Sequence, residues 1–239
     1  IFMANVLDFT CDSTPNDMIR DIFNHQHQLA EKYIPIEKNN GLCLYDQLPA
    51  EIDDAKAEAR IKDMSWRAIE EDAEAFEALD LMEYTHFYEE MADALHFLVE
   101  KYLLCNFLPV KPGHFSEFFL SPHVLGATTD LSKFFEDCSK YLAPISKEGT
   151  ELPPIRRAMM DSQMAEFTKN CGLTCNCLKN KPWKQSQMLT DIPKFRHRLS
   201  LEFESFISLC AISGFTADSL YAMYIRKNQV NQFRQRSNY

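Results

Sequence analysis

Residues 65–105 read SWRAIEEDAEAFEALDLMEYTHFYEEMADALHFLVEKYLLC, and this stretch predicts the architecture of the chain. Apolar residues recur in it at spacings of three and four, the period of an amphipathic helix. The pattern breaks near Met82, so it predicts one helix from near Pro49 to about Met82 and another from about Tyr84 to Cys105. Because the connection is so short, we expect the two helices to form an antiparallel hairpin.

The same period continues on both sides of this hairpin and predicts an all-α chain. Only six glycines occur in 239 residues, and 46% of the residues are apolar, which is enough for one sizeable core. We expect a single domain over 1–239, with a helical insertion at about 107–188. Further helices are expected from Thr14-Pro15 through Tyr33, near 131–141, near 156–170, from Pro193 to Ser213 with a stop at Gly214, and after a cap at Thr216.

Charge and composition exclude several classes of function. The net charge of −10 argues against a protein that grips a nucleic-acid backbone, because each neutralised phosphate needs a Lys or Arg. No stretch approaches the roughly 20 apolar residues of a spanning helix, and the chain does not open with a signal peptide. We therefore expect a cytoplasmic protein that does not bind membranes, with its eight cysteines reduced.

Four acidic residues stand out within the hairpin. Glu71 and Glu74 are three positions apart on its first helix, and Glu90 and Asp93 are three apart on its second. Residues i and i+3 share a helix face, so an antiparallel hairpin can bring the four carboxylates together. Such a cluster needs a cation, and hard oxygen ligands suit Mg²⁺ or Mn²⁺ better than zinc. The competing interpretation is a pair of solvated faces, since the chain has 35 acidic residues.

The setting of the second pair favours the metal site. Glu90 and Asp93 lie within EMADALHFLV at 90–99, on or beside the apolar stripe of their helix. Buried acids are costly unless they are paired or bound to metal. The register of the first pair stays open, because Glu70 and Glu77 are alternative ligands.

This combination resembles the all-α nucleoside triphosphate pyrophosphatases, which include the MazG-type enzymes, the dimeric dUTPases and the phage dCTP pyrophosphatases. That group carries Glu-x-x-Glu, a spacer and Glu-x-x-Asp, matched here by 71–74 and 90–93. Ser65-Trp66 is similar to a Ser-Trp that opens the first metal helix of the dimeric dUTPases. The resemblance implies a helical bundle with an antiparallel metal-binding hairpin, and a homodimer.

The C-terminal segment YIRKNQVNQFRQRSNY at 224–239 is more specific. It resembles the closing motif of dimeric dUTPases and phage dCTP pyrophosphatases, Tyr-x-x-Lys-Asn-x-x-Asn-x-x-Arg-Gln-x-x-Gly-Tyr. On a helix, positions 227, 231 and 234 share one face, and Arg can bind phosphate oxygens bidentately. A basic helix C-terminus that complements the macrodipole is the alternative. The resemblance assigns phosphate binding to Lys227, Asn231, Arg234 and Tyr239, and nucleoside binding to Asn228.

The chain departs from the family pattern in three places. Asn238 replaces the usual Gly before the final Tyr, although Asn tolerates positive φ better than most residues. The spacing from Trp66 to the first metal Glu is shorter than in the relatives. The chain ends at Tyr239, as phage dCTP pyrophosphatases do, and this favours a phage dCTPase-like protein acting in the host cytoplasm.

The resemblance and the clustered charge together imply hydrolysis of a pyrimidine deoxynucleoside triphosphate, dCTP or dUTP, to the monophosphate and pyrophosphate. The four acids would hold Mg²⁺ ions bridging the α- and β-phosphates, and water would attack the α-phosphorus with Glu71 or Glu74 as base. A MazG-like enzyme of broad or damaged-nucleotide specificity and a non-enzymatic helical interaction protein are the alternatives. The choice between dCTP and dUTP stays open.

Three further side chains have two interpretations each. Gln26 matches a Gln that lies by the base in the relatives, but it also suits a core position. Trp66 could line the nucleoside pocket, although a Trp on an apolar face is more often core. His96 could support the metal ligands, or it could be a buried core histidine.

The cysteine-rich segment 171–177 offers a second candidate site. Cys171, Cys175 and Cys177, with His197 downstream, could form a structural zinc site. The spacing lacks the paired Cys-x-x-Cys knuckles that make such a prediction strong, so a loop of reduced thiols is the alternative.

Overall fold

The computed structural model describes residues 15–41, 48–109, 129–136, 138, 143–145, 147–181 and 183–236. Within these ranges every regular element is an α-helix, which confirms the all-α prediction. The helices are α1 (Met18–Asn39), α2 (Ala55–Asp80), α3 (Tyr84–Leu104), α4 (Leu131–Glu136), α5 (Pro154–Cys175), α6 (Ile192–Ser213) and α7 (Ala217–Arg236).

The α2–α3 hairpin is the centre of the fold, as residues 65–105 predict. A tight turn joins the two helices, with Met82 in the left-handed region at φ 58°. The helix α2 begins at Ala55, later than the predicted start near Pro49, because the carboxylate of Asp54 accepts hydrogen bonds from the N–H groups of Lys56 and Ala57 at 2.9 Å each. This cap satisfies donors that a helix start otherwise leaves unpaired.

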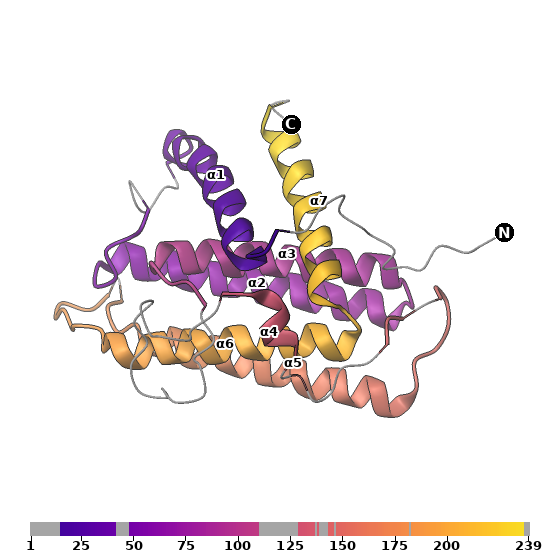
Figure 1. The fold of residues 1–239 in the computed structure, drawn as a ribbon. Coiled ribbons are helices and arrows are strands. Elements are labelled where there is room, and N and C mark those ends of the chain that lie inside the picture. The colour runs from indigo at the N-terminus through magenta and orange to yellow at the C-terminus, as the bar shows by residue number, and fades with distance from the viewer. Residues whose placement is uncertain are drawn as a thin grey trace.

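A second antiparallel pair, α5 and α6, packs against the α2–α3 hairpin (Figure 1). On the other side of the hairpin, α1 and α7 both contact α3 and extend away from the bundle. Among the described residues, no single helix is long and apolar enough to span a membrane; α6 and α7 pass that test only as a pair, bent by 103° at the break between them.

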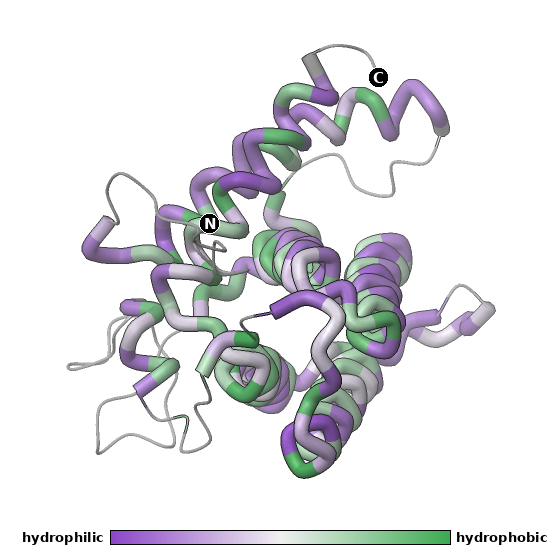
Figure 2. The backbone as a smooth tube through the Cα atoms, turned by 90° about the vertical axis from the view of Figure 1, so that its right-hand side faces the viewer, coloured by the Kyte–Doolittle hydropathy of each residue, from purple (hydrophilic) through white to green (hydrophobic). Residues whose placement is uncertain are grey.

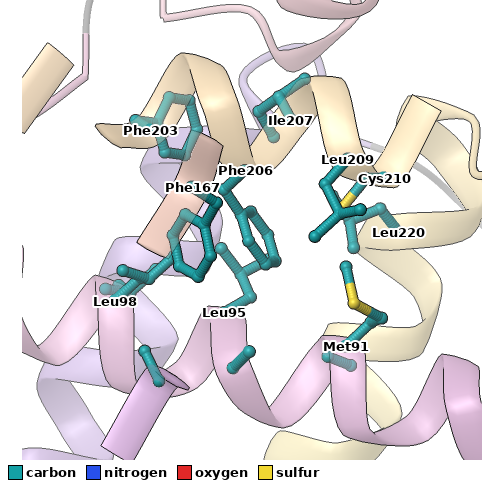
Figure 3. Packing of buried hydrophobic residues seen from close by; sticks show 14 of the residues in the cluster. Met91, Leu95, Leu98, Phe167, Phe203, Phe206, Ile207, Leu209, Cys210 and Leu220 are labelled. Carbon is teal, nitrogen blue, oxygen red and sulfur yellow. The ribbon is translucent and has the colours of Figure 1, made fainter. Parts of the chain in front are cut away.

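The core lies where these layers meet. Met91 and Leu95 of α3 face Phe167 of α5, Phe206 of α6 and Leu220 of α7, all of them buried (Figure 3). The outer parts of α1 and α7 are mainly hydrophilic, with a few hydrophobic residues such as Phe233 exposed among them (Figure 2). Buried residues of α4 and α5, which lie within the predicted insertion at 107–188, belong to this same core.

Besides the start of α2, three predicted helix boundaries differ in the structure. Asp17 caps α1, so Pro15 precedes the helix and the expected Thr14 cap lies outside the described residues. The helix α4 ends at Glu136, within the predicted 131–141. The helix α5 runs to Cys175, beyond the predicted end near position 170, because its last turns are buried against α2 and α6.

The junction of α6 and α7 follows the prediction. Gly214 ends α6 with φ 99°, and a Cβ there would lie 2.7 Å from Cα of Pro144. Only glycine accommodates both the left-handed backbone and this close approach. Thr216 then caps α7 by accepting a hydrogen bond from the N–H of Ser219 at 3.1 Å.

Candidate active site

The hairpin brings three acidic side chains together. Ligand oxygens of Glu71 on α2 and of Glu90 and Asp93 on α3 all lie within 4.8 Å of one another. Glu90 is buried and the other two are half-buried. Their spacing comes from the hairpin, because Glu90 and Asp93 occupy neighbouring turns of α3 that face α2.

The electrostatics of this acid cluster call for a cation. Burial raises the pKa of Glu71 to about 8, and a hydrogen bond to Glu90 and the charge of Asp93 act in the same direction. Two carboxyl groups in this contact must share a proton unless a positive ion replaces it. The donors are hard oxygens in a half-buried setting, so Glu71, Glu90 and Asp93 fit a divalent cation such as Mg²⁺ or Mn²⁺.

The acids of α2 differ in how close they lie to Glu90 and Asp93, and only Glu71 joins them within 4.8 Å among the described residues. Glu74 is exposed and lies outside the 4.8 Å group, but its charge contributes to the raised pKa of Glu71. Glu70 instead accepts hydrogen bonds from Trp66 and Arg67 at 2.6 and 2.8 Å. Glu77 is exposed and likewise lies outside the group. Tertiary packing therefore selects Glu71 among the candidate registers.

A lysine from the C-terminal helix reaches the cluster. Lys227 Nζ lies 2.6 Å from Asp93 Oδ2, and both side chains are about one-fifth exposed. Nδ1 of His86 lies 3.0 Å from Glu90 Oε1 on the neighbouring side. Asn231 and Arg234 follow Lys227 on the same face of α7, at helical positions i+4 and i+7. The basic face of α7 thus begins at the acid cluster.

Gln26 lies inside a buried polar network instead of facing open solvent. Its Oε1 accepts a hydrogen bond from the Tyr224 phenol at 2.8 Å, and its Nε2 donates to Glu100 at 3.4 Å. Glu100 in turn contacts Arg60, which also pairs with Glu37 of α1. The network joins α1, α2, α3 and α7 next to the acid cluster.

Sequence reasoning missed Arg60 and Tyr33 as residues of this region. Arg60 precedes Glu71 by eleven positions, three helical turns, and so lies on the same face of α2. The pKa of the Tyr33 phenol is raised, first by burial and then by the charge of Glu100, and its hydroxyl bonds to Gln235. The helical period could have indicated Arg60, but nothing in the sequence distinguishes Tyr33 from other aromatic residues of α1.

Asn228 is the most buried polar residue of the α7 motif, at 1% exposed. Its Oδ1 accepts a hydrogen bond from Gln232 at 2.9 Å, and its side chain also hydrogen-bonds the buried Tyr224 hydroxyl. The predicted phosphate ligand Tyr239 and its neighbour Asn238 lie outside the described residues.

Of the two other side chains with two interpretations, Trp66 is exposed and His96 is buried. Trp66 is 57% exposed, so it is not a core residue. His96 is buried, stacks on Tyr224 at 4.1 Å between ring centroids, and contacts the Ala92 carbonyl through Nδ1 at 2.9 Å. Burial lowers the pKa of His96 to about 4, which keeps the ring neutral.

The cysteine segment does not form a ligand cluster in the described structure. Cys171 and Cys175 lie on the last turns of α5, which corrects the expectation of a loop. Cys171 is buried, His197 is exposed, and the acid cluster is the one group of three or more potential ligands found among the described residues. All three thiols of 171–177 are free, with Cys175 Sγ 3.2 Å from Ser65 Oγ.

Comparison with known families gives one match. The family model described as dUTPase matches residues 80–239, about two thirds of the chain. The chain therefore belongs to the dUTPase family of all-α proteins, a family of nucleotide hydrolases. The matched segment includes Glu90, Asp93 and the α7 motif, whereas Glu71 precedes it. No curated protein and no solved structure matches the chain.

Proposed function

We propose that the protein hydrolyses a pyrimidine deoxynucleoside triphosphate, dCTP or dUTP, to the monophosphate and pyrophosphate with the help of Mg²⁺. The observation that carries this proposal is the convergence of Glu71, Glu90 and Asp93 beside Lys227, in a chain of the dUTPase family. Clustered carboxylates suit a hard divalent cation, and an adjacent ammonium suits the phosphates of a metal-bound substrate.

Each residue of the cluster has a separate role in this proposal. Glu71, Glu90 and Asp93 hold the cation, which when bound neutralises phosphate charge and activates water. Glu74 is exposed on the next turn of α2, where it can accept a proton from the attacking water. Lys227 now pairs with Asp93 at 2.6 Å. If Asp93 held a cation, the Lys227 ammonium would be placed to bind a phosphate oxygen of the substrate.

The α7 face extends the phosphate site away from the acids. Asn231 and Arg234 continue the line of Lys227 by one and two helical turns, a reach that suits the β- and γ-phosphates. The same motif assigns a phosphate contact to Tyr239. A triphosphate laid along α7 places its α-phosphorus nearest to the acid cluster.

Base recognition is assigned to Gln26 and Asn228, with Trp66 as a further nucleoside contact. Both groups of the Gln26 amide are already engaged, by Tyr224 and Glu100, and this fixes the direction of its donor and acceptor. The buried Asn228 amide carries two Nδ2 donors, and the one that Tyr224 does not use suits a pyrimidine carbonyl. A site built to hydrogen-bond one base edge discriminates strongly against a base that leaves its groups unpaired.

A pyrophosphate-release panel over all dNTPs and NTPs with Mg²⁺ tests the proposal. We expect dCTP or dUTP to exceed the purine nucleotides by more than about tenfold in kcat/KM. Glu90→Gln and Glu71→Gln should lose more than about 100-fold in kcat, because losing even an outer partner of a metal site costs about 10–100-fold. Glu77→Gln is the matched control, since it changes an exposed acid of α2 outside the cluster.

Three results would contradict parts of this proposal. Undiminished turnover in Glu90→Gln with an intact helical spectrum would reject the metal site. Equal rates on purine and pyrimidine nucleotides would favour a MazG-like enzyme. Absence of turnover, together with no thermal shift on adding Mg²⁺ and a non-hydrolysable dNTP, would favour an interaction protein. We also propose a homodimer, which light scattering during gel filtration tests directly.

A further inference from the structure

A pocket of about 630 Å³ opens where the end of α5 and the following loop meet the first half of α2. This volume is within the range of about 300–1,000 Å³ that small-molecule sites occupy. Most of its lining residues are small, carry an amide or carry a positive charge; the other two are Leu178 and Trp183. The lining residues are Ala59, Lys62, Gly172, Cys175, Asn176, Leu178, Lys179, Asn180, Lys181, Trp183 and Lys184.

This pocket, the α5-end pocket, is separate from the acid cluster. Lys62 and Glu71 are nine positions apart on α2, which at 100° per residue places them on opposite sides of the helix. Lys62 accordingly contacts the Leu178 carbonyl at 3.0 Å, after the end of α5, whereas Glu71 faces α3. A ligand in this pocket therefore leaves the acid cluster untouched.

The α5-end pocket is basic in a strongly acidic protein. The chain has 35 acidic residues and a net charge of −10, yet the span 167–190 contains no Asp or Glu. Four lysines line the pocket, at positions 62, 179, 181 and 184. Glu58 adjoins it, buried and in contact with Lys62 at 3.3 Å, and so does Asp53, whose carboxylate accepts a hydrogen bond from the N–H of Thr190 at 2.7 Å. The lysines therefore outnumber the local acids, and the pocket favours an anion.

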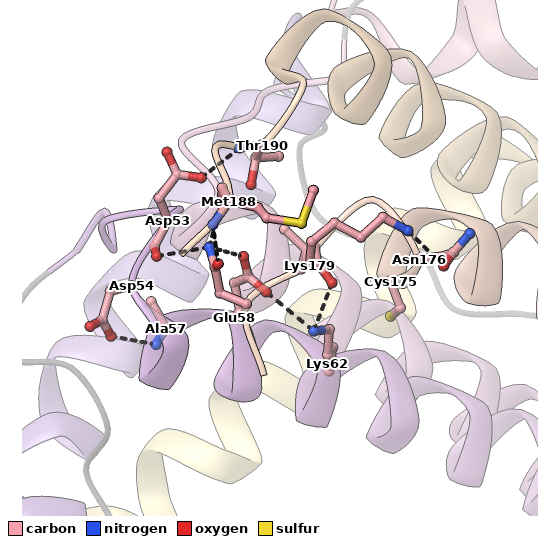
Figure 4. A network of polar contacts seen from close by, with 12 residues as sticks. Asp53, Asp54, Ala57, Glu58, Lys62, Cys175, Asn176, Lys179, Met188 and Thr190 are labelled. Carbon is pink, nitrogen blue, oxygen red and sulfur yellow. Dashed lines mark hydrogen bonds and ion pairs between the residues drawn. The ribbon is translucent and has the colours of Figure 1, made fainter. Parts of the chain in front are cut away.

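A hydrogen-bond network holds the pocket wall in place (Figure 4). The buried Asn180 amide donates to the carbonyls of Asp53 and Met188 at 3.1 and 2.8 Å, and to Glu58 at 3.0 Å. Met188 N–H returns a bond to Asn180 Oδ1 at 2.7 Å. Because these bonds tie the loop to the start of α2, the site is formed without a ligand, which reduces the entropic cost of binding.

An aromatic ring stands at the edge of the basic pocket. Trp183 is 75% exposed, and Lys181 Nζ lies 5.3 Å from its ring centroid. An exposed indole provides a face on which a planar ligand ring can stack, as bases stack on aromatic side chains in nucleic-acid binding proteins. Ammonium groups around an indole are the combination that suits a ligand with both a ring and phosphates.

We propose that the α5-end pocket binds a nucleoside polyphosphate, with the base on Trp183 and the phosphates on the surrounding lysines. Lys181 and Lys184 are exposed and reach the phosphates, while Asn176 and Lys179, joined at 3.0 Å, line the same pocket. An extended nucleic-acid strand is disfavoured, because it needs a continuous basic track and the rest of the chain is acidic. This site is independent of the proposed catalytic reaction.

Tryptophan fluorescence tests the proposal directly. The chain has two tryptophans, so Trp66→Phe leaves Trp183 as the only reporter. ATP is titrated in EDTA, which withholds divalent metal from the acid cluster. We expect saturable quenching that Lys181→Glu/Lys184→Glu weakens at least tenfold in Kd. The matched control is Lys56→Glu/Lys194→Glu, which makes the same charge change at two exposed lysines outside the pocket.

Titrations with other ligands test separate parts of the proposal. Inorganic triphosphate should bind at least fivefold more weakly than ATP, and equal affinity would overturn the role of Trp183. A short single-stranded oligonucleotide that binds more tightly than ATP would overturn the small-ligand assignment. No quenching at millimolar ATP, or equal weakening by the control pair, would overturn the site itself. None of these readouts depends on hydrolysis, so they stand apart from the test of the proposed enzyme.

Discussion

A buried ion pair between α3 and α6 offers the sharpest test of how this core is held together. Lys101 Nζ lies 2.8 and 2.7 Å from the two carboxylate oxygens of Glu202, and both side chains are 0% exposed. The Tyr102 hydroxyl donates to the same carboxylate at 3.3 Å. Burial alone would lower the pKa of Lys101, but the Glu202 charge overrides it and raises this pKa. Lys101 is therefore charged at neutral pH.

Removing one partner should cost far more than removing both. Lys101→Met leaves the Glu202 carboxylate buried without its cation, and such single removals cost about 3–5 kcal/mol. Lys101→Met/Glu202→Leu removes both charges and fills the space with apolar atoms. Because replacing a buried pair by hydrophobic residues is often neutral or stabilising, we expect the double variant to lie within about 1–2 kcal/mol of the parent.

Equilibrium urea unfolding, followed by helical circular dichroism, measures these differences. The control is Lys169→Met, which removes an exposed partner of Glu166 on α5 and should leave stability unchanged. A raised lysine pKa means that the pair stabilises fully below the unfolded value of 10.5 and that this contribution fades as pH rises above it. If the double variant loses as much as Lys101→Met alone, or if Lys101→Met costs less than about 1 kcal/mol, the reasoning fails.

Three further substitutions have defined outcomes. The Asp72 carboxylate is buried with no hydrogen-bond partner among the described residues, and burial raises its pKa from 3.8 to about 7. Its charged form therefore destabilises the folded protein increasingly as pH rises, and Asp72→Asn should gain about 2–3 kcal/mol more stability at pH 8 than at pH 5. Equal gains at the two pH values would contradict the burial argument. Gly214→Ala should lower the free energy of unfolding, measured in urea, by at least about 3 kcal/mol, because the new Cβ would overlap the Pro144 backbone at positive φ. A decrease of less than about 1 kcal/mol would contradict this close approach. Glu148→Gln should lower the melting temperature, because Glu148 accepts a hydrogen bond from the N–H of Tyr84 at 2.6 Å. Hydrogen bonds hold the pKa of Glu148 below the usual 4.5, so the difference in melting temperature between parent and variant should shrink as pH falls through that range. A difference that persists in acid would contradict this explanation.

Local signals predicted the helices best where the cap residue is adjacent in sequence. Gly214 and Thr216 end α6 and begin α7 as expected, because a left-handed stop and a side-chain cap act within one turn. The N-terminus of α3 behaves differently. Glu83 makes no side-chain cap there, and Glu148, 64 residues later than Tyr84, supplies the acceptors. Such a cap depends on the fold and has no local signature.

For the candidate site, too, local spacing predicted one part and tertiary packing decided the other. Helical spacing placed Glu90 and Asp93 on one face of their helix. It did not decide which acid of the preceding helix, Glu70, Glu71, Glu74 or Glu77, lies beside them. The approach of α3 turns Glu71 into the cluster and leaves Glu70 to bond Trp66. A period of 3.6 residues defines a face but not the rotation of that face against its neighbour.

By itself, the sequence determined the all-α class, the α2–α3 hairpin, the family resemblance and the basic face of α7, because each of these follows from residue spacing within one or two elements. Only the tertiary structure decided that Lys227 meets Asp93, that Gln26 is engaged by Tyr224 and Glu100, and that basic residues gather at the α5-end pocket. These features join residues far apart in the chain, and packing between helices, which has no linear signature, brings them together.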